Sequence, residues 1–142
     1  MNFTNAGLAI IKKFEGFSAK AYRDIGGVPT IGFGHTGPDV QMGDEISELE
    51  AENLLRGDLL HFDHGVLRLL TAPTNDNEFS AMVSLAYNIG LGAFQKSSVL
   101  KFHNQGKKAL AKAAFLLWIK VNGHPLNGLI RRRTAEANLY AS

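Results

Sequence analysis

The chain has 142 residues, of which 45% are hydrophobic and 20% charged, as expected for one folded domain. It contains no cysteine, which excludes disulfides and thiolate chemistry. No apolar run approaches the roughly 18 residues of a membrane-spanning helix. The N-terminus lacks the pattern of a secretion signal, so we expect a chain without an export signal of its own.

The net charge of +2 conceals an uneven distribution along the chain. Residues 1–78 hold 12 acidic and 6 basic side chains, whereas residues 79–142 hold 1 acidic and 9 basic ones. A cationic second half favours an anionic partner, such as nucleic acid, acidic lipid or an anionic polymer. An ordinary solvated helical surface accounts for the same charges. Nucleic acid is disfavoured because interleaved aromatic residues and any recognisable binding module are missing, so we expect no nucleic-acid partner.

The first predicted element is a helix that begins after Thr4, a residue type suited to the N-cap, and ends near Glu15. Leu8, Ile11 and Glu15 fall on one face, which places the carboxyl group at the edge of the apolar stripe. The helix dipole disfavours an acidic residue at this end, which indicates a local purpose for Glu15. The alternative is an ordinary surface carboxylate that points at water.

A β-hairpin is predicted next, with strands at residues 21–24 and 30–34 around a turn at 25–28. In the second strand Thr30, Gly32 and Gly34 share one face, where missing side chains would let a ligand approach the backbone. If the turn is a three-residue loop, Asp24 and Thr30 lie opposite each other on that face.

The rest of the chain is predicted to be helical. Capping-box patterns at Ser47–Glu50 and Asn75–Glu78 open two helices, the first reaching about Leu70 and the second stopped by Gly90. Further helices are expected at residues 97–105, 107–121 and 128–140. These helices are expected to be interrupted at Gly106, at Asn122 to Pro125 and at Gly128.

These elements predict an α+β fold in a single domain covering residues 1–142. A small β-containing lobe (17–46) and a larger helical lobe (1–16 and 71–142) are joined by a connecting helix (47–70). The ligand site is expected in a cleft between the two lobes.

Other kinds of site have little support in the sequence. His61, Asp63 and His64 form an isolated HxDH pattern on a helix, which is more typical of a solvated face than of a metal site, so we expect no bound metal. The glycines around Phe33 lack the third glycine and the following helix of a dinucleotide site. No paired Ser, His and Asp pattern supports a nucleophilic triad.

The carboxylate pair Glu15 and Asp24, followed at a fixed spacing by Thr30, resembles the catalytic signature of phage-type lysozymes, the endolysins that form a family of glycoside hydrolases. The flanking segments Phe14-Glu15-Gly16, Ala21-Tyr-Arg-Asp24 and Thr30-Ile-Gly-Phe-Gly-His35 agree with it. So do the later segments Phe79-Ser-Ala-Met-Val-Ser-Leu-Ala-Tyr-Asn88-Ile-Gly90, Gly92-Ala-Phe94, Trp118 and Gly128-Leu-Ile-Arg-Arg-Arg-Thr-Ala-Glu136. The basic, apolar segment 107–121 departs from every catalytic motif. The resemblance covers nearly the whole chain and implies a lysozyme-like fold.

The resemblance also implies roles for individual residues. Glu15 resembles the general acid that protonates the leaving glycosidic oxygen, Asp24 the carboxylate that orients or deprotonates a water, and Thr30 the residue that holds this water. Water attack of this kind implies inversion at the reacting carbon. Positions expected to bind substrate are Gly32, Phe33, Asn88 and Arg132. For Asn88 a local role at the helix end is an equal alternative.

Two further expectations concern the surroundings of these residues. The resemblance implies that one of Arg131, Arg132 and Arg133 approaches Glu15. Successive helical residues point about 100° apart, so all three cannot face the cleft, and we favour Arg132. His35 is expected to pair with Asp58, a structural contact whose ion pair would raise the pKa of the histidine.

The function implied is a muramidase that cleaves the β-1,4 bond between N-acetylmuramic acid and N-acetylglucosamine of peptidoglycan during host lysis. The resemblance implies that the enzyme needs no metal or organic cofactor and is a monomer. It also implies that the enzyme stays in the host cytoplasm until a holin-type pore releases it to the wall. The cationic second half would aid contact with an anionic envelope, whether lipid or lipopolysaccharide.

Two alternatives stay open. A membrane-active or wall-binding protein would act through the cationic second half, where residues 107–118 could insert into a lipid surface, although an ordinary buried helix explains that segment better. A lytic transglycosylase would release an anhydro-sugar without consuming water, which the Asp24 and Thr30 pattern argues against.

Overall fold

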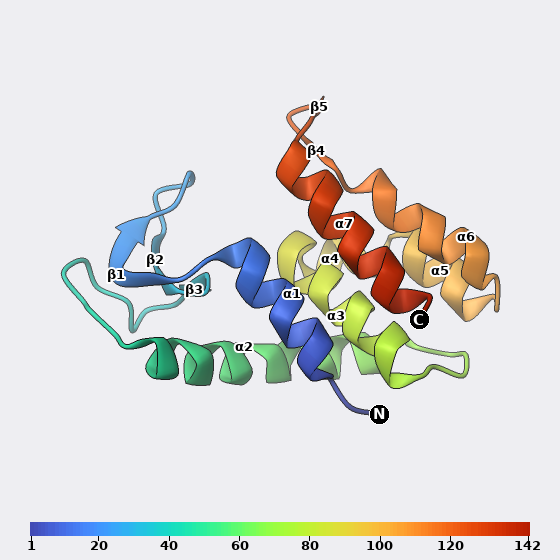
Figure 1. Ribbon diagram of the computed structural model, residues 1–142, viewed down its shortest axis with the longest axis horizontal. Coiled ribbons are helices and arrows are strands. Elements are labelled where there is room, and N and C mark those ends of the chain that lie inside the picture. The colour runs from blue at the N-terminus through green and yellow to red at the C-terminus, as the bar shows by residue number, and fades with distance from the viewer. The chain divides into compact units, whose positions relative to one another are not determined.

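The computed structural model describes all 142 residues, which form seven α-helices, one short 3-10 helix and two small antiparallel sheets (Figure 1). The α-helices are α1 (Asn5–Glu15), α2 (Glu48–Leu69), α3 (Asp76–Ile89), α4 (Leu91–Gln95), α5 (Ser98–Asn104), α6 (Lys108–Ala114) and α7 (Asn127–Tyr140), and the 3-10 helix is η1 (Phe115–Leu117). The strands are β1 (Ser18–Arg23), β2 (Pro29–Gly32), β3 (His35–Thr36), β4 (Lys120–Val121) and β5 (His124–Pro125). The α+β class is confirmed. No helix is both long and apolar enough to cross a membrane.

The chain divides into two compact units, a smaller one of residues 11–61 and a larger one of residues 1–10 and 62–142. The smaller unit holds the three-stranded sheet, and the larger unit holds the two-stranded sheet and most of the helices. Helices α1 and α2 each contribute residues to both units.

In the smaller unit the sheet has the order β1-β2-β3. Tyr22 pairs with Thr30 and Arg23 with Pro29, so five residues form the loop between β1 and β2. The conditional expectation of a three-residue loop, with Asp24 opposite Thr30, is therefore wrong. Asp24 lies one residue beyond the paired strand, where its backbone N–H donates to the carbonyl of Val28 at 3.0 Å.

Helix α2 begins at the predicted capping box, in which Ser47 Oγ accepts from the N–H of Glu50 at 3.1 Å and Glu50 Oε1 accepts from the N–H of Ser47 at 3.1 Å. In the smaller unit this helix buries Ala51, Leu55 and Leu59. Three buried apolar residues spaced four apart are typical of an amphipathic helix that packs on a core. The predicted helix is therefore confirmed.

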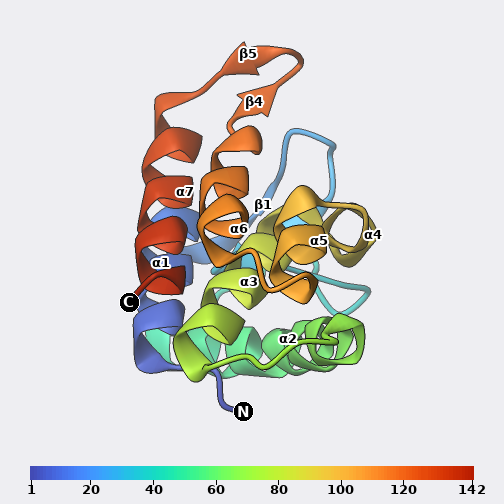
Figure 2. The same cartoon turned by 90° about the vertical axis from the view of Figure 1, so that its right-hand side faces the viewer.

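The larger unit is built around α3, whose residues from Glu78 to Ala86 are all buried. Helix α3 packs against α7, as the side view shows (Figure 2). The first turn of α1 approaches α3 closely, since Thr4 N–H donates to Ser80 Oγ at 2.8 Å and a Cβ on Gly7 would meet Ser80 Cβ at 2.9 Å. The second predicted capping box is present, with Asn75 and Glu78 exchanging bonds.

The predicted helix over 107–121 is wrong beyond Leu117. The chain leaves η1 and forms the β4–β5 hairpin, in which Val121 pairs with His124 across the two-residue turn Asn122-Gly123. Both turn residues have positive φ, 52° and 80°, the conformation that an Asn-Gly hairpin turn requires. Helix α4 was not predicted either, because its five residues are too short to show a helical period.

Candidate active site

Asp24 and Thr30, two of the three predicted catalytic residues, are both held by the backbone of Val28. The N–H of Val28 donates to Asp24 Oδ1 at 2.9 Å, and the Thr30 hydroxyl donates to the carbonyl oxygen of Val28 at 2.9 Å. Asp24 is exposed, whereas Thr30 is buried. The loop therefore fixes one carboxylate oxygen and uses the only proton of the hydroxyl, so that Thr30 Oγ1 can serve a ligand only as an acceptor.

Glu15 is the last residue of α1 and is half-buried. The next residue, Gly16, has φ of 73° and donates its N–H to the carbonyl of Lys12 at 3.1 Å. This is a glycine helix stop, which turns the chain from Glu15 into the β1–β2 hairpin, whose loop holds Asp24 and whose strand β2 holds Thr30. All three predicted catalytic residues thus belong to the smaller unit.

Gly32 and Phe33, two predicted substrate-binding positions, have structural explanations in the smaller unit. Gly32 has φ of 68°, and a Cβ there would meet Ala51 Cβ at 3.0 Å, so the space that was expected for a ligand is filled by α2. Phe33 is buried, with its ring 5.6 Å from the ring of Phe17 and the Lys12 amine 5.4 Å from its centroid. Packing therefore accounts for both residue types.

The predicted pair of His35 and Asp58 is present, and a second carboxylate joins it. His35 Nδ1 lies 2.7 Å from Asp58 Oδ2, and Nε2 lies 3.1 Å from Asp39 Oδ2. Partial burial by itself lowers the pKa of His35, but the hydrogen bonds and charges of Asp58 and Asp39 outweigh burial and raise it. The histidine in turn lowers the pKa of Asp39. This cluster ties β3 to α2 within the smaller unit.

In the larger unit two of the three consecutive arginines are buried on one carboxylate. Glu136 Oε2 accepts from Arg132 Nε at 3.2 Å, and Glu136 Oε1 accepts from Arg133 Nη1 at 2.6 Å. Ser84 Oγ also donates to Glu136, at 2.5 Å, and the Ser84 carbonyl accepts from Arg132 Nη2. Arg131 is exposed. Sequence reasoning treated Glu136 as the end of a motif, whereas it is the buried partner that the two arginines share.

Asn88, the other predicted substrate-binding residue of this unit, is linked to the same cluster. Arg133 Nη2 donates to Asn88 Oδ1, and Arg133 Nε donates to the Trp118 carbonyl at 2.9 Å. Because the side-chain oxygen of Asn88 faces the arginine, its NH₂ group is the end left to serve a ligand. The exposed position of Asn88 agrees with such a role.

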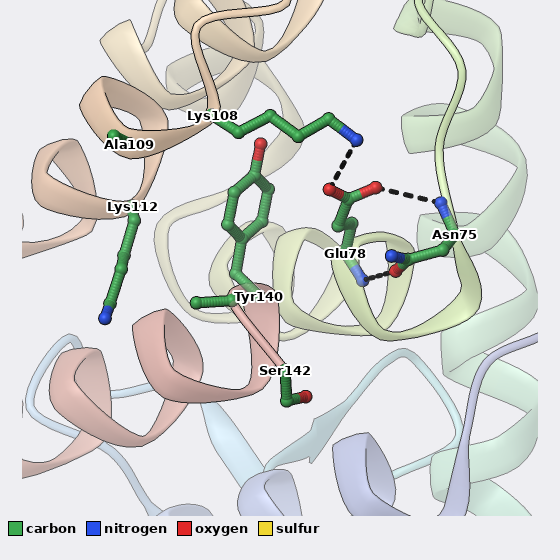
Figure 3. Close-up of a pocket in the computed structure, with 8 residues that line it drawn as sticks. Asn75, Glu78, Lys108, Ala109, Lys112, Tyr140 and Ser142 are labelled. Carbon is green, nitrogen blue, oxygen red and sulfur yellow. Dashed lines mark hydrogen bonds and ion pairs between the residues drawn. The ribbon is translucent and has the colours of Figure 1, made fainter.

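A separate hollow of about 340 Å³ lies in the larger unit between α3, α6 and the end of α7 (Figure 3). The buried carboxylate of Glu78 lines it and accepts from Lys108 Nζ at 2.6 Å and from the Asn75 N–H at 2.9 Å. Figure 3 shows both bonds directed away from the Lys112 amine. Lys108 is therefore a structural cation, since removing it would strand a buried negative charge.

His103 is fully buried in the same unit, between two hydroxyl groups. Thr74 Oγ1 donates to the Ala72 carbonyl at 2.9 Å, so it must accept from His103 Nε2, 2.7 Å away. The other nitrogen, Nδ1, then accepts from the Tyr140 hydroxyl at 2.7 Å. Burial lowers the pKa of His103 and raises that of Tyr140, which favours this neutral arrangement.

No group of three or more His, Cys, Asp or Glu side chains is arranged to hold a metal ion. In particular, His61, Asp63 and His64 form no such group. Burial raises the pKa of Asp63, and its Oδ1 has no hydrogen-bond partner.

The fold is an α+β fold with seven α-helices and two small sheets. Its smaller unit holds a carboxylate at a helix end, a carboxylate in a loop and a buried threonine. These features are those of a lysozyme-like protein. The phage lysozyme family model matches residues 12–136. The endolysin of Bacillus phage PZA is 44% identical over 100% of this chain and 56% of its own length. The muramidase domain of SpmX from Asticaccaulis excentricus has a TM-score of 0.94 at 36% identity, over 99% of this chain and 98% of that one. A mutant of the phage P22 lysozyme has a TM-score of 0.90 at 39% identity, over 100% and 99%.

The chain therefore belongs to the phage lysozyme family. It spans about half the length of the endolysins of Bacillus phages PZA and B103, with 56% and 54% of those proteins covered.

Proposed function

We propose that this protein hydrolyses the β-1,4 bond between N-acetylmuramic acid and N-acetylglucosamine in bacterial peptidoglycan, and that it serves host-cell lysis. The observation that carries the proposal is that the backbone of one residue, Val28, anchors both Asp24 and Thr30, in a unit where Glu15 ends the preceding helix. Two carboxylates around one bond are the minimum equipment for glycoside hydrolysis. Membership in the phage lysozyme family supports the choice of peptidoglycan.

In the proposed mechanism Glu15 is the general acid that protonates the leaving glycosidic oxygen. A water molecule would donate one proton to Thr30 Oγ1 and the other to the second carboxylate oxygen of Asp24. The bonds to Val28 support this geometry, because they leave both of those atoms as acceptors. A water held by both protons presents its lone pair outward, toward the sugar carbon it attacks.

Inversion at the reacting carbon follows from direct attack by this water. The alternative within hydrolases is retention, in which Asp24 would itself bond to the sugar and the carboxyls would stand about 5 Å apart. The fixed, hydrogen-bonded Oδ1 of Asp24 favours the role of a base over that of a nucleophile. NMR of freshly formed products distinguishes the two routes, since inversion of a β bond yields the α-anomer first.

The substrate contacts that we propose include Asn88 and Arg132 in the larger unit. The NH₂ group of Asn88 would donate to an acetamido carbonyl of the glycan, and Arg132 would contact the substrate beside it. The bond from Arg133 to Asn88 Oδ1 and the shared partner Glu136 support a preset position for both side chains. Packing explains the side chains at Gly32 and Phe33. We therefore propose that these two residues bind substrate through their backbone groups.

The direct test replaces Glu15 with glutamine. The Glu15→Gln variant should lose wall-clearing activity by at least about 10²-fold, the usual value of a general acid, because the amide carries no transferable proton. Clearing of purified peptidoglycan and thermal unfolding are measured together, with Glu45→Gln as the control for the same change at an exposed site. Retained clearing by Glu15→Gln would sink the assignment.

Mass spectrometry of the soluble fragments separates this function from that of a lytic transglycosylase. A hydrolase yields muropeptides with a reducing N-acetylmuramic acid end that has gained water, whereas a transglycosylase yields the anhydro form. Anhydro products would contradict hydrolysis, although the same glycosidic bond would be cleaved.

The proposed setting is that of an endolysin, the name given to its relatives from phages PZA and P22. We propose that the enzyme is a monomer, that it needs no metal or organic cofactor, and that it waits in the host cytoplasm for a holin-type pore. Expression with and without a pore-forming protein tests release, light scattering tests the monomer, and activity in a chelator tests metal independence.

The proposal also includes a role for the positive charge of the larger unit. All six exposed lysines after residue 78, together with exposed Arg131, belong to the larger unit, and its one acidic residue in that stretch, Glu136, is buried. These exposed cations would draw the enzyme to an anionic envelope and its polymers.

A further inference from the structure

Most of the exposed large hydrophobic side chains of the larger unit lie in the segment from α6 to the start of α7. Leu116, Leu117, Val121 and Leu126 are 44%, 68%, 47% and 45% exposed. We call these four side chains the apolar strip. With Leu110 they make up five of the seven exposed large hydrophobic side chains of this unit, the others being Met1 and Leu67.

The strip lies on chain that projects from the body of the unit. Leu116 and Leu117 belong to η1, Val121 to β4, and Leu126 directly follows β5. The N–H of Leu126 donates to the Ile119 carbonyl at 3.0 Å, so both ends of the hairpin are held together at its base. Figure 1 and Figure 2 both show the hairpin extending past the first turn of α7.

The exposed charges next to the strip along the chain are all positive. Lys112 precedes it on α6, Lys120 lies within it on β4, and Arg131 follows it on α7, all three exposed. No acidic residue occurs between Glu78 and Glu136, and both of those carboxylates are buried on basic partners. A partner that meets this surface must therefore offer both negative charge and an apolar phase.

We infer that this surface docks on an anionic lipid bilayer, with the apolar strip entering the acyl boundary and the cations lying at the headgroups. A glycan strand or a nucleic acid offers negative charge but no apolar phase for leucine. Long basic side chains beside exposed leucines are the arrangement found in interfacial segments. The inference is independent of the proposed catalysis, because none of these residues belongs to the catalytic set.

The chain carries its own reporter for this contact. Trp118, the only tryptophan, directly follows η1 and is half-buried. Full-length protein is mixed with vesicles of phosphatidylcholine containing phosphatidylglycerol, and with pure phosphatidylcholine vesicles. We expect co-sedimentation and a blue shift of Trp118 emission with the anionic vesicles alone, and quenching by brominated acyl chains.

Matched variants identify the contact. Leu117→Asn should weaken partition at least about tenfold, because a leucine side chain can no longer be buried. Leu49→Asn is the control, since Leu49 is 69% exposed on α2 and lies outside the strip. Lys120→Gln should weaken partition about fivefold, the usual effect of one cation near an anionic surface. Lys20→Gln is its control.

Each other outcome overturns the inference. Equal losses for Leu117→Asn and Leu49→Asn would mean that the strip is not the specific contact. A loss for Lys120→Gln without one for Leu117→Asn would mean charge attraction without insertion. If Leu117→Asn instead lowers retention of the Glu15→Gln protein on lipid-free peptidoglycan, the strip serves the wall. The Glu15→Gln protein itself should bind vesicles like the unmodified chain, so failure of catalysis and failure of docking are separable.

Discussion

At the scale of single residues, the hydroxyl of Thr30 is the sharpest test of the proposed water site. Thr30→Val keeps the side-chain shape but removes the acceptor oxygen, so we expect peptidoglycan hydrolysis to fall about 10²-fold. Folding should change little, because the Val28 carbonyl keeps its bond from the Asp24 N–H. Thr30→Ser, which restores the hydroxyl, should recover most of the activity. Full activity in Thr30→Val would contradict a water held by this residue.

Glu136 is the residue whose loss should cost the most stability. It is fully buried and pairs with both Arg132 and Arg133, so Glu136→Gln would remove the carboxylate charge that these two buried guanidinium groups share. We expect a loss of about 3–5 kcal/mol in the free energy of unfolding, measured by urea denaturation.

The matched control is Glu45→Gln, which breaks the exposed pair with Lys20 at 3.6 Å. That change should cost less than about 1 kcal/mol. Similar losses for the two variants would mean that the buried cluster contributes no more than a surface pair.

At the scale of elements, two histidines anchor different helices and should respond to pH with opposite signs. The pKa of His35 is raised by Asp58 and Asp39, so its contribution to stability is present below about pH 6.5 and is lost as pH rises through its folded pKa. The pKa of His103 is lowered by burial, so its contribution is present above about pH 6.5 and is lost as pH falls through its folded pKa. The charges near His103 are those of Glu78, which opposes the shift, and Lys108, which adds to it.

Unfolding free energies of His35→Asn and His103→Gln across pH check this prediction. Relative to the unmodified chain, the His35→Asn deficit should shrink as pH rises above about 6.5, and the His103→Gln deficit should shrink as pH falls below it. The His35 pair is partly exposed, so its contribution is on the order of 1 kcal/mol. Deficits that do not vary with pH would contradict both assignments.

Elements whose ends are marked by capping or turn residues could be predicted from sequence, and elements without such residues could not. The capping boxes at Ser47 and Asn75 placed the starts of α2 and α3 correctly. The helix after Lys107 was extended too far because apolar residues continue past Leu117 into a hairpin whose Asn-Gly turn was read only as a helix stop. The short pairing of β3 depends on contacts with β2 and has no local pattern.

For the candidate site, the sequence predicts candidate residues but not how the fold holds them. The backbone of Val28, which anchors Asp24 and Thr30, carries no residue-specific signal, because its N–H and carbonyl exist at almost any residue. The sharing of Glu136 by two arginines depends on side-chain paths through a buried region. Only the pairing of His35 with Asp58 was anticipated, from the resemblance to the family.

At the scale of the whole molecule, the uneven charge should make wall lysis depend on salt. We expect the rate on intact peptidoglycan to fall as ionic strength rises above about 0.15 M, where the Debye length is about 8 Å, because the attraction is screened. Turnover of a short, uncharged chitin-type oligosaccharide should change much less. Replacing Lys101, Lys107 and Lys120 with glutamine should flatten the salt dependence, and Lys108 is left in place because it neutralises Glu78.

An unchanged salt dependence in the triple variant would show that the exposed cations of the larger unit do not drive the attraction. The same three changes at Lys13, Lys20 and Arg23 of the smaller unit provide the control, because they remove equal charge from the other part of the chain.

The position of the single tryptophan has a consequence for measuring how the protein folds. Trp118 belongs to the larger unit, and the smaller unit contains no tryptophan. Selectively excited fluorescence therefore follows the unfolding of one unit, whereas circular dichroism follows the helices of both. If the two denaturation curves coincide, the chain melts as one cooperative body, and if they separate, the unit that carries Glu15, Asp24 and Thr30 has a stability of its own.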